Sequence, residues 1–182
     1  SALVAALSNA AALAIVLAVR LPTWRYAVAG AIAGVGISAM HYLAMAAWCE
    51  ERNFEGFGKW MRIQAREESG HAMRLFEFVL DRGGHVELGP LTQPKAAWKT
   101  PLAVFDAAAK HEAGVSASIR SIYERAGKEK DHSCQIMLQW FITEQVEEEK
   151  TSTAIVERLR LVGDNPAALM MLDSQLGART GE

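Results

Sequence analysis

The stretch FEGFGKWMRIQAREESGHAMRLFEFVLD, residues 54–81, has the period of one long α-helix. A spacing of three or four residues collects one set of side chains on a single face, which is expected to point into a core. That face comprises Phe57, Met61, Gln64, Glu68, His71, Ala72, Leu75 and Val79. An acid and a histidine therefore stand in the middle of a face that ordinarily carries apolar side chains.

Three further helices are predicted after this one, at residues 101–125, 131–162 and 166–176. The expected N-caps are Asn53, Thr100 and Asn165, and the glycines at 83–84 and 163 are expected to end helices. Residues 85–100 contain two prolines and lack a helical period. They are therefore expected to form a long connection.

Three long amphipathic helices with one long connection favour a four-helix bundle with one long crossover, because their apolar faces need a fourth partner. That partner would have to come from residues 26–50. The predicted fold class is all-α, with a short C-terminal fifth helix and an extra apolar helix at residues 2–19. The expected division is an apolar helix and basic turn at residues 1–25, followed by the bundle at residues 26–182.

The first quarter of the chain has a composition of its own. Residues 1–48 contain no acid and only two cations, Arg20 and Arg25, whereas all 21 acids lie further along the chain. Residues 2–19 and 26–48 are apolar enough to form a transmembrane hairpin with a positive loop. A pair of buried, alanine-rich helices is the alternative, and the bundle competes with the membrane for residues 26–48.

The net charge and the cysteine content limit which partners and which cellular compartment are expected for this chain. A formal net charge of −2 gives no reason to expect a nucleic-acid partner. Two cysteines, Cys49 and Cys134, are too few for a disulfide scaffold and are expected to be reduced thiols in a cytosolic compartment.

Acids stand in the apolar faces of the other two long helices as well. Glu112 lies between Phe105 and Ile119, and the acids and amide of the last long helix lie between Phe141 and Ile155. Burying unpaired carboxylates costs several kcal/mol each, and a shared cation would offset that cost. Glu68 and His71, at i and i+3, suit such a cation. A solvated charged face remains the alternative, chiefly for Glu147 and Glu149.

Three motifs resemble bacterial non-haem ferritins over about residues 42–179: AWCEERNFEGFGKWMRIQAREESGHAMRLFEFVLDRGG at 47–84, AAAKHE at 107–112 and LQWFITEQVEEEK at 138–150. The resemblance implies a ferritin-like bundle that assembles into a homo-oligomeric cage of 24 subunits in the cytoplasm. Members of this family oxidise ferrous iron with dioxygen or peroxide at a dinuclear site in each subunit, which is ferroxidase activity. They store the ferric product as a mineral.

The same resemblance implies a role for particular residues. Glu68 and His71 match the ligands of the first iron, with Glu68 bridging, and Glu112 and Glu148 match those of the second, with Gln145 beside it. Tyr42 matches the tyrosine near this centre. Glu67, Glu144 and Glu147 match the acids of a third iron site. The family pattern also has a glutamate seven residues before the tyrosine, where this chain has Val35. We therefore expect weak binding of the first iron and impaired oxidation.

The N-terminal segment carries a different resemblance. GISAMHYLAM, residues 36–45, resembles one repeat of the MHYT-type bacterial membrane sensor domains, and the apolar hairpin at residues 1–46 matches that family too. A chimera joined within residues 38–48, either a natural fusion or an artefact, is the resulting hypothesis. The alternative function is a membrane-anchored sensor or binding fragment, located in the inner membrane through residues 2–48, with a non-functional ferritin remnant.

Overall fold

The structure is a computed structural model that describes residues 38–86 and 97–181. All regular structure in these ranges is helical: a helix at residues 38–50, then α3 (Glu55–Asp81), α4 (Pro101–Lys128), α5 (His132–Val162) and α6 (Pro166–Gly177). The predicted all-α class is confirmed. The predicted helix at residues 2–19, the boundary between residues 25 and 26, and Val35 lie outside the described residues.

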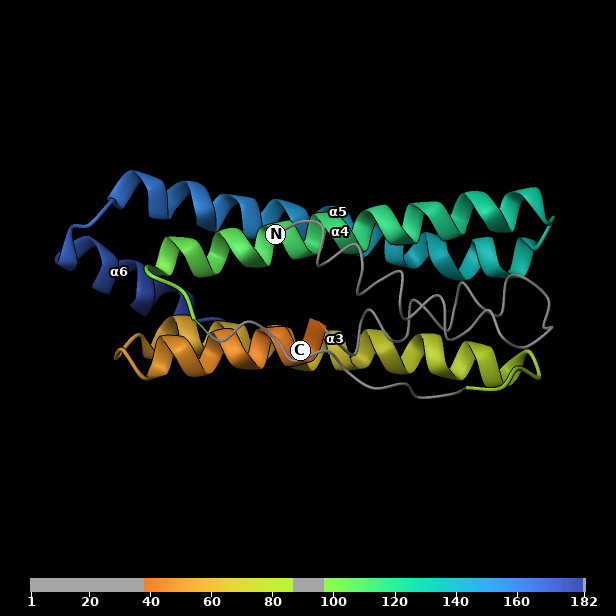
Figure 1. Ribbon diagram of the computed structural model, residues 1–182, viewed down its shortest axis with the longest axis horizontal. Helices are drawn as coiled ribbons and strands as arrows, with labels where there is room; N and C mark the ends of the chain where they lie inside the picture. Colours follow the sequence, from red (N-terminus) through yellow and green to blue (C-terminus); the bar gives the residue numbers. More distant parts are fainter. Residues whose placement is uncertain (1–37, 87–96, 182) are drawn as a thin grey trace.

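The helices form two antiparallel pairs that lie alongside each other (Figure 1). The helix at 38–50 pairs with α3, and α4 pairs with α5. The short α6 packs at the end of the bundle where α3 begins. Because α3 ends at the end of the bundle opposite to the start of α4, the connection between them is the predicted long crossover.

Most of the predicted helix ends are confirmed by their capping contacts. Thr100 Oγ1 accepts a hydrogen bond from the Ala103 amide at 3.2 Å, and Asn165 Oδ1 accepts one from the Ala168 amide at 3.1 Å. Gly163 ends α5 with a φ of 55°, in the left-handed region that glycine tolerates. α4 continues to Lys128, three residues past its predicted end, so Gly127 lies inside the helix.

The predicted N-cap of α3 was wrong. Asn53 lies in the preceding turn with a φ of 62°, and the N-cap is Phe54, whose side chain offers no oxygen. The Asp173 carboxylate of α6 takes over this role. It accepts hydrogen bonds from the amides of Gly56 at 3.0 Å and Phe57 at 2.8 Å. A cap that comes from another helix leaves no local sequence signal.

The core consists of two apolar clusters separated along the bundle by a polar layer. One cluster lies near α6 and includes Phe57, Trp60 and Phe105, and the other lies toward the far end and includes Leu75 and Leu138. Most of the buried polar side chains stand between the two clusters along α3, α4 and α5. They comprise Gln64, Glu68, His71, Glu112, Ser116, Gln145, Glu148 and Ser152.

Within residues 38–86 and 97–181, no helix is both long enough and apolar enough to cross a membrane. Most of the predicted transmembrane hairpin lies outside these ranges, and residues 38–48 of its second helix belong to the described helix at 38–50.

Candidate metal centre

The polar layer draws one or more side chains from each long helix. Six of the residues expected at a dinuclear site are buried in it: Tyr42, Glu68, His71, Glu112, Gln145 and Glu148. They share the layer because the faces of α3, α4 and α5 that were predicted to point inward do so. Tyr42 comes from the helix at 38–50, and its side chain is 1% exposed.

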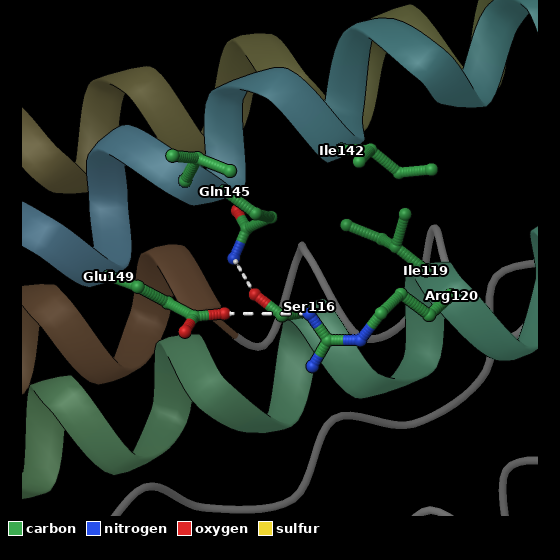
Figure 2. Close-up of a pocket in the computed structure, with 7 residues that line it drawn as sticks. Ser116, Ile119, Arg120, Ile142, Gln145 and Glu149 are labelled. Atoms are coloured by element: carbon green, nitrogen blue, oxygen red, sulfur yellow. Dashed lines mark hydrogen bonds and ion pairs between the residues drawn. The ribbon is translucent and has the colours of Figure 1, made fainter.

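Both carboxylate oxygens of Glu112 accept hydrogen bonds. The Tyr42 hydroxyl donates to Oε1. Gln145 Nε2 lies 3.2 Å from Oε2, 3.3 Å from the Glu112 carbonyl oxygen and 3.1 Å from Ser116 Oγ. Gln145 and Ser116 also line a pocket of about 210 Å³ between α4 and α5 (Figure 2). Glu112 is therefore held from two sides.

Glu148 has a buried amide partner from α3. Gln64 Nε2 donates to Glu148 Oε2 at 2.8 Å, and Gln64 is completely buried. The Ser152 hydroxyl donates to the Glu148 carbonyl oxygen at 2.7 Å. These contacts place the Glu148 carboxylate between α3 and α5.

Glu68 differs from the other two acids. It is 1% exposed, and among the described residues no group donates a hydrogen bond to either of its oxygens. His71 Nδ1 lies 3.3 Å from Oε1, which is close enough for an ion pair if the ring is protonated but does not meet hydrogen-bond geometry. A buried carboxylate without donors costs several kcal/mol unless a proton, a water molecule or a cation compensates for it.

The acids of the layer perturb one another's pKa values. Burial, and then the negative charge of Glu68, raise the pKa of Glu112 to about 7. Burial, and then the charges of Glu112 and Glu68, raise the pKa of Glu148 to about 7. Without a cation, the layer therefore disfavours having all its acids ionised at once. A divalent ion would relieve this repulsion and displace the protons.

The same charges shift the pKa values of Tyr42 and His71. Burial, followed by the adjacent Glu112, raises the pKa of Tyr42 well above its ordinary value, so the phenol stays a proton donor. Burial acts to lower the pKa of His71, but the nearby acids Glu68, Glu144 and Glu148 outweigh it, and the net shift is upward.

The acids expected at a third site are less closely gathered. Glu67 is half-buried and paired with Arg179, whose Nη2 lies 3.0 and 2.8 Å from its two oxygens. Glu144 is half-buried. Burial, and to a smaller extent the charge of Glu144, raise the pKa of Glu67, whereas the Arg179 guanidinium acts to lower it. Glu147 is exposed on α5.

No three His, Cys, Asp or Glu side chains in the described parts of the chain converge closely enough to coordinate one metal ion. The hydrogen bonds from Tyr42, Gln145 and Gln64 direct carboxylate oxygens toward protein donors instead. The layer thus brings the expected ligands together in one buried region without arranging them as a coordination sphere.

Sequence reasoning missed three contributors to this region. Gln64 was placed on the buried face without a role, although it holds Glu148. Ser116 stands one helical turn after Glu112, a spacing that could have indicated it. Arg179 lies beyond the last helix, where no periodic signal exists.

Comparison with known proteins agrees with the geometry. The model of the ferritin-like domain matches residues 30–162, so the match begins twelve residues before Tyr42. A bacterial non-heme ferritin of Bacteroides fragilis (strain 638R) is 38% identical over 138 residues, which is 76% of this chain and 86% of the relative. Its counterpart from Staphylococcus aureus (strain USA300) is 34% identical over 143 residues, 79% of this chain and 86% of the relative.

A solved structure, the open pore ferritin of the hyperthermophilic archaeon Archaeoglobus fulgidus, superposes with a TM-score of 0.86 at 40% sequence identity. The match covers 89% of this chain and the whole of that one. The expected resemblance to bacterial non-haem ferritins is confirmed, and the chain belongs to the ferritin family.

Proposed function

We propose that this chain stores iron, and that it oxidises ferrous iron at a dinuclear site built from Glu68, His71, Glu112 and Glu148. Family membership supports the iron-storage part of this proposal. One observation carries the site: Glu68 is fully buried among Glu112, Glu148 and His71, and neither of its oxygens has a hydrogen-bond donor among the described residues. A carboxylate in that position needs a cation more than any other group in the layer does.

In this proposal each residue has a distinct task. Glu68 bridges the two iron ions, His71 completes the first, and Glu112 and Glu148 bind the second. Carboxylate oxygens suit both ferrous and ferric iron, because they are hard donors that can bind through one or both atoms. Electrons pass from ferrous iron to dioxygen or peroxide, and the ferric product moves on to the store.

Tyr42 and Gln145 act on the site through Glu112. Their hydrogen bonds occupy its two oxygens, so iron binding would exchange at least one of these hydrogen bonds for a metal bond. Protons held by Glu112 and Glu148 at neutral pH would leave at the same time, because raised pKa values keep these acids partly protonated.

Val35 stands where the family pattern has a glutamate, and this difference affects the expected rate of iron oxidation. With valine there, the first iron keeps only His71 and the bridging Glu68 among the family ligands. We propose that binding is weakened and oxidation slowed for this reason, while storage in a cage is retained.

We also propose that the chain works as a homo-oligomer, a cage of 24 subunits as the family resemblance implies, in the cytoplasm. Its described surface carries strongly exposed apolar side chains, including Leu161 at 87% and Met171 at 66%. Large apolar side chains exposed in this way suit burial against neighbouring subunits.

The test uses the full chain, purified without detergent and stripped of metal. Anaerobic calorimetry with ferrous iron would compare it with Glu68→Gln, which removes the charge but keeps the volume. Glu77→Gln, at an exposed position on the same helix, is the control. We expect tight binding that Glu68→Gln lowers at least tenfold and Glu77→Gln leaves unchanged. Equal binding in all three proteins would contradict the proposed site.

A further inference from the structure

The end of α6 and the residues that follow it pack against α3. Lys59 Nζ donates to the Gly177 carbonyl oxygen at 2.7 Å. A side chain at Gly177 would place its Cβ 2.9 Å from the Cα of Gly56, so the end of α6 lies directly against the start of α3. These contacts position Arg179 beside the middle of α3.

Arg179 makes three kinds of contact in this place. Its guanidinium binds both oxygens of Glu67, at 3.0 and 2.8 Å, and donates to Gln64 Oε1. It also lies 5.1 Å from the centre of the Trp60 ring, within range of a cation–π interaction. Its side chain is 27% exposed, so the charge is largely withdrawn from solvent.

These contacts extend into the polar layer. Gln64 accepts from Arg179 through Oε1 and donates through Nε2 to Glu148 at 2.8 Å. An amide has one acceptor end and one donor end, so the guanidinium fixes which end faces Glu148. Arg179 is thus a positioning residue for Glu148, although the two do not need to touch.

We propose that the Arg179 guanidinium is a resident cation, which means that it occupies Glu67 in place of a metal ion. Each subunit then binds one metal ion fewer for as long as Arg179 stays paired with Glu67. This inference rests on the proposed iron-binding function and on the third iron site that the ferritin resemblance implies at Glu67, Glu144 and Glu147. Both Glu67 oxygens already accept charge-assisted hydrogen bonds from Arg179 Nη2, and such bonds are stronger than those between neutral groups. A divalent ion at Glu67 would also stand next to a fixed positive charge and be repelled by it.

The experiment counts redox-inert Zn²⁺ ions bound to the metal-free full chain by calorimetry. Arg179→Gln removes the cation and keeps an amide that can still hydrogen-bond. Arg160→Gln is the matched control, because Arg160 is exposed and pairs with Asp106 at 3.1 Å on the α4–α5 face. We expect Arg179→Gln to bind one additional Zn²⁺ per subunit, or to bind the last ion at least tenfold more tightly. Arg160→Gln should leave the count unchanged.

A double variant tests where the new ion binds. Adding Glu67→Gln to Arg179→Gln should abolish the gain. An unchanged count in Arg179→Gln, or a gain that survives loss of Glu67, would overturn the inference. A second variant that ends at Ala178 should behave like Arg179→Gln, which keeps the test independent of one substitution.

Failure here is separable from failure of the proposed function. If Zn²⁺ or ferrous iron binds in a Glu68-dependent way and Arg179→Gln changes nothing, only the resident cation is wrong. Where Glu68→Gln has no effect but Arg179→Gln gains a Glu67-dependent ion, the dinuclear site fails and the resident cation stands.

Discussion

The Tyr42 hydroxyl donates a hydrogen bond to the Glu112 carboxylate, and it joins the helix at 38–50 to the middle of α4. The stretch that resembled both a ferritin helix and a membrane repeat is therefore, from residue 38 onward, a bundle helix in this structure. Its inner face packs Tyr42, Met45, Trp48 and Cys49 into the apolar cluster near α6.

Replacing Tyr42 by phenylalanine should destabilise the metal-free protein in a pH-dependent way. The ring would still fill its space, but Glu112 Oε1 would lose its donor, which costs about 1–3 kcal/mol for a buried charged acceptor. The loss should appear in urea denaturation at pH 8, where Glu112 is ionised, and should shrink at pH 5, where it is protonated. Tyr123→Phe, at a half-buried position on α4, is the control. Equal losses at both pH values would contradict this role.

The metal-free protein should become less stable as pH rises from about 4.5 to 7. In the unfolded chain the carboxyls of Glu112 and Glu148 titrate near 4.5, whereas in the folded chain their pKa is about 7. Between these values the folded state holds more protons than the unfolded state, so stability falls with rising pH and is lowest above 7. The acids contribute no such difference below about 4.5, where both states are protonated.

Urea midpoints measured between pH 4.5 and 8.5 would check this dependence. The double variant Glu112→Gln/Glu148→Gln should flatten the slope, because its amides do not titrate. A saturating divalent metal should reverse the trend, since it binds the ionised carboxylates. A wild-type midpoint that rises steadily with pH in the absence of metal would count against the raised pKa values.

Much of the fold was predictable because the determining signals are local and periodic. Phe57, Met61, Leu75 and Val79 recur at helical spacing and are buried as expected. Thr100, Asn165 and Gly163 act where their residue types are favoured. The start of α3 was not predictable, because its cap is supplied by Asp173, about 117 residues away in sequence.

The site was predictable in its membership but not in its contacts. Acids and a histidine in the middle of apolar faces indicated that Glu68, His71 and Glu112 are buried together, and they are. Which oxygens are satisfied depends on amides and hydroxyls from other helices, such as Gln64 on Glu148. The pairing of Glu67 with Arg179 depends on the path of the chain after α6, which has no sequence period.

Removing the carboxylate of Asp173 should loosen α6 from the bundle. This side chain is 6% exposed and satisfies two amides at the start of α3, so Asp173→Ala should cost about 0.5–2 kcal/mol, the usual effect of losing a helix cap. Asp173→Asn should cost less, because one amide oxygen can still accept. The exposed Asp164→Asn is the control. Hydrogen exchange gives the sharper readout: the amides of Gly56 and Phe57 should lose protection first, while those in the middle of α5 keep theirs. Uniform loss of protection across all helices would mean that α6 and α3 unfold only with the whole bundle. The Asp173 cap would then not be the contact that holds α6 to α3.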